Sequence, residues 1–207
     1  MTISLPRMKR AVAEICAADK RFETIVQKNG ICTIGRTPAQ VSHFESLVES
    51  VVSQQLAVRA ADTIHGRLLN LANGKITPQR IAKLAVNDMR AAGLSGAKTK
   101  TIMGLSAAAL SGEIAINDLH LQEDEIVFEQ LTSLWGIGPW TVDMFMMFQL
   151  GRLDIWPTGD LGVRRGWERI HNLKAQIEPA KLNLRGEKFR PHRSVVAWYC
   201  WRALDNK

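Results

Sequence analysis

The chain of 207 residues is 46% hydrophobic and 23% charged. This composition predicts a globular protein of one domain or two small lobes, and it excludes a disordered, collagen-like or large multidomain chain. The formal net charge is +7, and most of the excess lies in residues 150–207, which hold 12 basic and 6 acidic side chains. Clustered Lys and Arg favour a polyanionic partner, although the same balance can serve solubility alone.

Cysteine spacing and hydropathy restrict the class of protein further. Cys16, Cys32 and Cys200 lie far apart and form no Cys-x-x-Cys pair, so we expect no zinc site, no iron–sulfur cluster and no disulfide framework. No apolar run approaches the ~18 residues of a membrane span, and the N-terminal segment lacks the apolar core of a signal peptide. We therefore expect an intracellular protein with no membrane partner.

Helical spacing of apolar residues dominates after residue 40, and period-2 strand patterns are scarce, so the sequence predicts an all-α fold. A polar interruption at residues 53–55 separates two helical stretches, Thr77-Pro78 is typical of an N-cap followed by the first helical position, and Gly112 is typical of a helix end. The expected elements are, in chain order, a brief extended piece at 31–34 and helices over 44–51, 58–68, 78–89, 97–110, 124–134, 140–150 and 161–170.

A Gly-x-Gly turn, Gly136-Ile137-Gly138, joins the helices expected over 124–134 and 140–150. Glycines let the backbone turn sharply, and the following Pro139 suits the start of the second helix. Backbone N–H groups at such a helix start can face a phosphate, aided by the helix dipole. A tight helical hairpin without any ligand is the alternative. The residues expected to face the phosphate are Gly136, Gly138, Trp140 and Thr141.

Asp160 stands at the expected N-cap of the helix over 161–170. Local chemistry alone makes it a capping residue. Capping is compatible with catalysis, because a helix N-terminus hydrogen-bonds the charged carboxylate, the form that stabilises a developing positive charge on a sugar.

Four segments together resemble the helix-hairpin-helix DNA glycosylases, and within them the 3-methyladenine DNA glycosylase II group. The resemblance covers about residues 40–203 and implies two helical lobes with a cleft between them. The lobes would be residues 1–40 with 165–207, and residues 41–164, which include the helix-hairpin-helix at 124–150. The four segments are SQQLAVRAA at 53–61, LWGIGPWT at 134–141, DIWPTGD at 154–160 and RPHRSVVAWYCWR at 190–202.

The resemblance implies a monofunctional glycosylase that flips an alkylated purine, 3-methyladenine or 7-methylguanine, out of duplex DNA and hydrolyses its N-glycosidic bond in base excision repair. Asp160 would be the catalytic carboxylate, an anion that stabilises oxocarbenium character at the sugar. Trp140 stands where bifunctional relatives place a Schiff-base lysine, so no lyase step is expected. Trp140 and Trp201 match aromatic positions of the base pocket, although ordinary core packing is the alternative for each.

The resemblance also implies contacts with the DNA. The family pushes a wedge into the minor groove from the region that contains Gln54, Gln55 and Leu56, for which an ordinary turn between helices is the alternative. Phosphate contacts are expected from basic side chains that could equally be solvated surface charges. These basic residues are Arg164, Arg165, Arg193 and Lys98. The hairpin carbonyls of the family can hold a monovalent cation; no other metal or cofactor is expected, because the four-cysteine cluster of some relatives is missing.

Two other functions remain open at this point. The same scaffold could remove another damaged base, such as hypoxanthine or uracil, or it could be a non-catalytic helix-hairpin-helix module that only binds DNA. In the favoured interpretation the partner is double-stranded DNA containing alkylated bases, bound by a monomer. Its place of action would be the nucleoid-associated cytoplasm of a bacterium or the nucleus of a eukaryote.

Overall fold

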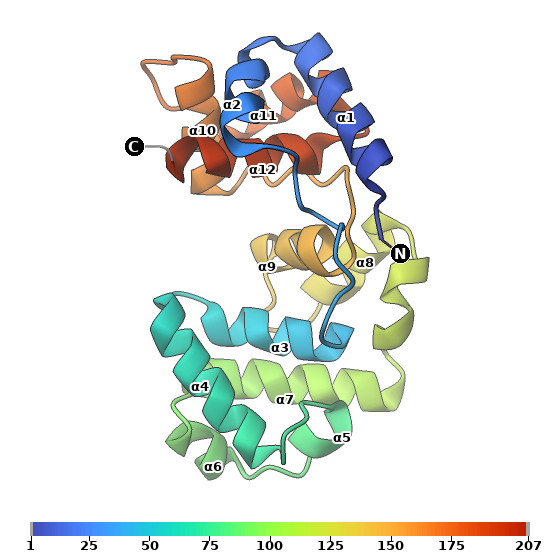
Figure 1. Ribbon diagram of the computed structural model, residues 1–207. Helices are drawn as coiled ribbons and strands as arrows, with labels where there is room; N and C mark the ends of the chain where they lie inside the picture. Colours follow the sequence, from blue (N-terminus) through green and yellow to red (C-terminus); the bar gives the residue numbers. More distant parts are fainter. Residues whose placement is uncertain (1, 206–207) are drawn as a thin grey trace. The chain divides into compact units, whose positions relative to one another are not determined.

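The computed structural model describes residues 2–205, and within them it contains helices and no strand (Figure 1). The all-α prediction is confirmed. The chain divides into two compact units. We call residues 1–38 with 146–207 the terminal unit, and residues 39–145 the central unit. No helix of the described residues is both long and apolar enough to cross a bilayer.

The division differs from the expected one at both boundaries: residues 39 and 40 belong to the central unit, and residues 146–164 belong to the terminal unit. The physical reason lies in hydrogen bonds that the sequence does not signal. The backbone N–H of Ile155 donates to Ser194 Oγ at 2.8 Å, and the indole N–H of Trp156 donates to the Leu182 carbonyl at 3.1 Å. These bonds tie the segment before Asp160 to the C-terminal helices.

Helix α12 forms the centre of the terminal unit. Its residues 194–200 are all buried, and the Tyr199 hydroxyl donates to the Gly30 carbonyl at 2.9 Å. Helix α10 packs closely on α12 because Gly166 has no side chain; a Cβ there would run into the backbone of Cys200. The elements of this unit are α1 (Leu5–Ala18), α2 (Arg21–Asn29), α10 (Leu161–Ile170), α11 (Pro179–Gly186), the 3-10 turn η3 (Glu187–Phe189) and α12 (Arg193–Asp205).

Helix α7 is the longest helix of the central unit and contacts α3, α5 and α6. The elements of this unit are α3 (His43–Ser53), α4 (Val58–Leu71), α5 (Pro78–Ile81), α6 (Val86–Ala91), α7 (Gly96–Ser111), the 3-10 turn η1 (Ile116–Leu121), α8 (Asp124–Thr132) and α9 (Pro139–Met144). A π-helical turn, η2 (Phe145–Gln149), follows α9 and leads into the terminal unit.

The predicted helix ends agree with the structure where a cap marks them. Thr77 Oγ1 accepts from the N–H of Arg80, and α7 ends at Gly112, whose φ is +79°.

Three expectations about secondary structure are wrong. The helix expected over 78–89 is two short helices, because i→i−3 hydrogen bonds at residues 83 and 84 close α5 and Ala85 is extended. The segment 31–34 is irregular, and the helix over 140–150 changes to a π turn after Met144.

Candidate active site

Asp160 is the N-cap of α10, as predicted, with extended backbone angles. Its Oδ1 accepts two hydrogen bonds, from the backbone N–H of Val163 at 2.7 Å and from the indole N–H of Trp201 at 2.9 Å. One donor belongs to α10 and the other to α12. The half-buried carboxylate is therefore oriented by two helices that pack against each other.

One aromatic ring, Trp201, contacts this carboxylate, and a second ring, Phe148, lies against Trp201. Trp201 lies close to the start of α10 because Gly162 leaves room for it; a Cβ on Gly162 would lie 2.8 Å from the Trp201 ring and 3.0 Å from Asp160 Oδ1. The ring of Phe148, which is 51% exposed, lies 5.9 Å from that of Trp201, with 31° between their planes. The terminal unit thus places one carboxylate and two aromatic faces together.

Sequence reasoning missed Phe148. The helical spacing expected over 140–150 selects Val142, Phe145, Met146 and Leu150 as the apolar face and leaves Phe148 out. The π turn that carries Phe148 has no recognised signal in the sequence, although such turns are frequent at functional sites.

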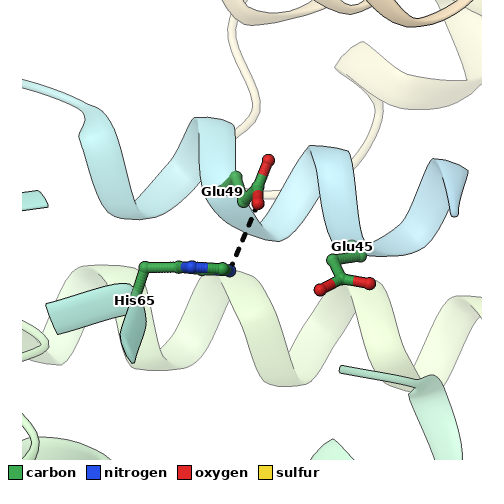
Figure 2. Close-up of side chains that lie close together, drawn as sticks. All are labelled: Glu45, Glu49 and His65. Atoms are coloured by element: carbon green, nitrogen blue, oxygen red, sulfur yellow. Dashed lines mark ion pairs between the residues drawn. The ribbon is translucent and has the colours of Figure 1, made fainter. Parts of the chain in front are cut away.

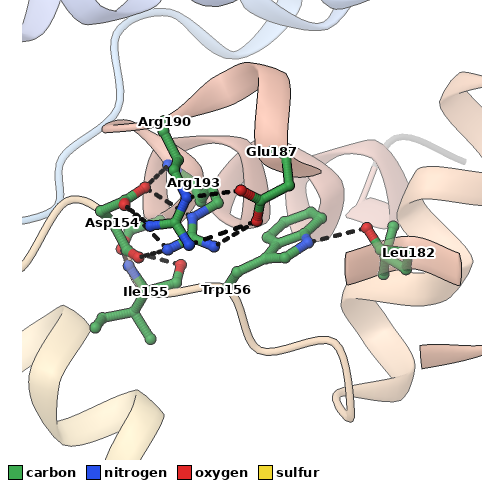
Figure 3. Close-up of polar contacts among 8 residues, drawn as sticks. Asp154, Ile155, Trp156, Leu182, Glu187, Arg190 and Arg193 are labelled. Atoms are coloured by element: carbon green, nitrogen blue, oxygen red, sulfur yellow. Dashed lines mark hydrogen bonds and ion pairs between the residues drawn. The ribbon is translucent and has the colours of Figure 1, made fainter. Parts of the chain in front are cut away.

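The segment that leads to Asp160 is anchored at its start by Arg193 (Figure 3). The Arg193 guanidinium forms a bidentate ion pair with the Asp154 carboxylate, with N–O distances of 2.8 and 3.0 Å. It also contacts a carboxylate oxygen of Glu187 at 3.3 Å. Arg190 adds a 2.9 Å ion pair to Asp154 and, through its hydrogen bond to Glu187, lowers the pKa of that carboxyl group. Arg193 is only 9% exposed. This placement does not fit the predicted phosphate contact, because the guanidinium is committed to two internal carboxylates.

Ser194 and Trp156 complete the anchor. Ser194 Oγ accepts from the N–H of Ile155 and donates to its carbonyl at 3.2 Å. The Trp156 ring lies over Gly186, where a Cβ would collide with the indole. Asp154 and Ser194 were missed because their partners lie 36 to 39 residues away along the chain. Of the other predicted phosphate contacts in this unit, Arg165 is exposed and Arg164 is half-buried.

We expect Arg193→Met to lower the free energy of unfolding by about 3 kcal/mol, because it leaves a partly buried carboxylate with an incomplete set of partners. Arg165→Met, which removes an exposed charge from α10, is the matched control and should change stability by less than about 0.5 kcal/mol. Urea unfolding followed by circular dichroism measures both. Equal stability of the two variants would contradict the anchor.

In the central unit, the hairpin turn between α8 and α9 lies against α7. Gly136 has a φ of +85°, and a Cβ there would run into the side chain of Thr101. Gly138 is the N-cap of α9. Trp135 and Trp140 are 54% and 49% exposed. The hairpin therefore has a fixed backbone and two exposed indole rings.

Thr141 does not fit the predicted phosphate contact. Its backbone N–H donates to the Gly138 carbonyl at 3.0 Å, and the residue is buried. Its hydroxyl oxygen accepts from the Gln54 amide at 3.2 Å. Thr141 therefore stabilises the hairpin turn through internal hydrogen bonds.

The three wedge candidates occupy the turn between α3 and α4, and the structure separates them. The Gln54 amide N–H donates to the Gly136 carbonyl at 3.3 Å as well as to Thr141, so its side chain faces the hairpin. Gln55 is exposed with a φ of +55°, and Leu56 is 39% exposed. The monovalent cation expected at the hairpin carbonyls stays a prediction.

Lys98 is a further departure from expectation. Its ammonium donates to the carbonyls of Val52 and Gln54, both at 2.8 Å. Two of its three N–H donors are thus engaged by backbone carbonyls within the central unit. Burial lowers the pKa of this ammonium.

One group of three potential metal-ligating side chains occurs in residues 2–205, and it lies on α3 and α4 (Figure 2). Glu45, Glu49 and His65 bring their ligand atoms within 4.8 Å of one another, and His65 Nε2 lies 3.5 Å from a Glu49 oxygen. Burial, together with the charge of Glu45, raises the pKa of Glu49. None of the three is a predicted site residue, and the His65–Glu49 contact joins two packed helices.

The predicted site residues thus form two groups. Asp160, Trp201 and the two α10 arginines belong to the terminal unit. The hairpin, Trp140 and the turn with Gln54, Gln55 and Leu56 belong to the central unit.

Comparison with known proteins places these residues in a family. Residues 48–191 match the model of the HhH-GPD superfamily of base excision DNA repair proteins. DNA-3-methyladenine glycosylase 1 of Schizosaccharomyces pombe is 31% identical over 199 residues, which cover 94% of this chain and 87% of that protein.

Solved structures of similar proteins support the same family. A DNA-3-methyladenine glycosidase from Bacillus halodurans has a TM-score of 0.85 at 33% identity, covering 95% of this chain and 89% of that one. The 3-methyladenine DNA glycosylase of S. pombe in complex with abasic DNA has a TM-score of 0.82 at 30% identity, covering 93% and 95%. This chain therefore belongs to the HhH-GPD superfamily of base excision DNA repair proteins.

Proposed function

We propose that this chain is a monofunctional DNA glycosylase that releases alkylated purines, 3-methyladenine and 7-methylguanine, from double-stranded DNA. The observation that carries the proposal is the Asp160 carboxylate, held by Val163 and Trp201 beside two aromatic rings. The relatives named as 3-methyladenine glycosylases, and the one bound to abasic DNA, support it.

In the proposed reaction Asp160 acts on the sugar of a nucleotide that has left the base stack. The bond between C1′ and the base nitrogen breaks, and its electron pair neutralises the positive charge of the alkylated purine. The fixed anion stabilises the oxocarbenium character that develops at C1′. Water then adds to C1′ and loses a proton, leaving an abasic site and a free base. A cationic leaving base needs no strong general acid.

The aromatic rings give the proposed site its preference for cationic bases. An indole face attracts a cation, contributing about 0.5–2 kcal/mol per contact. Trp201 is suited to this because its N–H is bonded to Asp160, which fixes the ring relative to the carboxylate. Phe148 adds a second aromatic face beside Trp201. The exposed Trp140 indole of the central unit stays a predicted base contact, as the resemblance implies.

The central unit supplies most of the proposed contacts with the DNA duplex. The backbone around Gly136 and Gly138 would face a phosphate, with Arg164 and Arg165 of the terminal unit as further phosphate contacts. Because Gln54 is engaged with the hairpin, we assign the minor-groove wedge to Gln55 or Leu56. A monomer would suffice, acting in the nucleoid-associated cytoplasm of a bacterium or the nucleus of a eukaryote.

The test is release of free base from methylated duplex DNA, measured by chromatography. We expect 3-methyladenine and 7-methylguanine in the supernatant, and no covalent adduct after borohydride, because the Trp140 indole cannot form an imine. Duplexes with hypoxanthine or uracil are run in parallel, and release from these alone would favour the alternative substrate class. DNA binding without any release would favour a non-catalytic module, and a trapped adduct would contradict the hydrolytic mechanism.

A further inference from the structure

The turn that carries the wedge candidates is fastened to helix α7 by a single ammonium group. We call residues 54–57 the probe turn. Lys98, in the first turn of α7, donates to the carbonyls of Val52 and Gln54 at 2.8 Å each. The last carbonyls of a helix have no partner within the helix and lie at the negative end of its dipole. Lys98 therefore supplies from another helix the cap that the C-terminal end of α3 requires.

The same part of α7 also contacts the hairpin. The Thr101 side chain lies against Gly136, where no Cβ would fit, and the Lys100 ammonium lies 4.2 Å from the centre of the Trp135 ring. Gln54 joins the probe turn directly to the hairpin through the Gly136 carbonyl and the Thr141 hydroxyl. The probe turn, the hairpin and α7 are thus connected pairwise, and all three lie in the central unit.

We propose that Lys98 is a positioning residue that holds the probe turn in a fixed register with the hairpin, so that Gln55 and Leu56 meet the base stack while the hairpin holds the backbone. The inference rests on the proposed function. If the turn became ordered only on contact with DNA, its loss of conformational entropy would reduce the free energy of binding. A turn that is already ordered avoids this loss, so more of the binding free energy is available to offset base unstacking. A lysine bonded to two carbonyls serves this purpose, because two of its three N–H donors then hold the backbone of the turn.

The first test measures base flipping. A duplex carries an alkylated purine with 2-aminopurine beside it, and fluorescence and single-turnover release are recorded for wild type and Lys98→Met. We expect the variant to bind the duplex but to lose flipping amplitude, with release slower by about 100-fold, the size expected of a small misplacement. The deficit should shrink when the lesion faces an abasic site, because that base is already unpaired.

Two matched variants separate positioning from charge and from folding. Lys83→Met removes one exposed positive charge from the same unit and should flip and release like wild type. Lys98→Arg retains donors for the two carbonyls and should recover part of the lost rate. A Lys98→Met protein that flips and releases at wild-type levels would overturn the inference, as would an equal loss in Lys83→Met.

The second test needs no DNA. Amide hydrogen exchange of residues 54–57 is compared in free wild type, Lys98→Met and Gln54→Ala, with exchange in α10 as an internal reference. We expect faster exchange at the probe turn in both variants and no change in α10. Unchanged exchange would overturn the role of Lys98. If wild type flips the lesion but releases no base, the proposed function fails, while the flipping and exchange measurements still decide whether Lys98 positions the turn.

Discussion

Asp160→Asn should lower the single-turnover rate of base release by about 100-fold or more, because it removes the anion from a site where preorganised charge supplies a large part of the rate enhancement. Asparagine is as good an N-cap as aspartate. Its side-chain oxygen can still accept from the N–H groups of Val163 and Trp201. The substitution therefore removes the charge and retains the local hydrogen bonds.

The control is that folding and DNA binding survive. We expect thermal unfolding of Asp160→Asn within a few degrees of wild type and an unchanged or slightly tighter affinity for lesion-containing duplex. Asp160→Ala should additionally lose about 1 kcal/mol of stability, because it removes the cap. If Asp160→Asn releases base at the wild-type rate, the carboxylate is not the catalytic group. If it loses affinity and rate together, the carboxylate acts in binding.

Gly166→Ala should destabilise the protein by about 3 kcal/mol, at the upper end of overpacking effects. The added Cβ would meet the carbonyl group and the Cα of Cys200, which are backbone atoms of α12 and cannot rotate away. For a chain of this length we expect a melting temperature lower by about 6–12 °C. Helices α10 and α12 would have to separate, and because Asp160 and Trp201 sit on these two helices, the rate of base release should fall as well.

Gly104→Ala is the opposite case within the same protein. Gly104 lies on an exposed face of α7, and no atom stands within 4 Å of the position its Cβ would take. Replacing glycine by alanine in a helix interior stabilises by roughly 0.5–1 kcal/mol. Calorimetric melting of both variants checks the pair. A melting temperature of Gly166→Ala equal to that of wild type would show that the two helices are not packed as described.

Local signals were sufficient to predict the elements around the candidate site. A cap needs only its own side chain and the next three residues, so the roles of Thr77 and Asp160 as N-caps follow from the sequence. Gly136 at a tight turn is equally local. For the same reason the all-α fold and the hairpin were predicted, since helical spacing repeats over a few residues.

Contacts between distant residues were not predictable in this way. The guanidinium of Arg193 is the kind of group that contacts phosphates, but its actual partner, Asp154, lies 39 residues earlier in the chain. Lys98 likewise looks like a surface charge until α3 is placed beside α7 and its last carbonyls come within reach. Residues 146–164 joined the terminal unit through such contacts. Spacing along a chain reports which face a side chain occupies, whereas pairing depends on which helices meet.

Helix α12 bonds to both ends of the segment that runs from Asp154 to Asp160. Arg193 and Ser194 hold its beginning, and Trp201 holds its end, about 12 Å farther along the helix at 1.5 Å per residue. One residue inserted into α12 between Ser194 and Trp201 would rotate the indole by about 100° about the helix axis, away from Asp160, while the other two contacts stayed in place. Homologues that keep this arrangement can therefore vary α12 by substitution but not by a single-residue insertion or deletion, and aligning their sequences over this helix should require no gap.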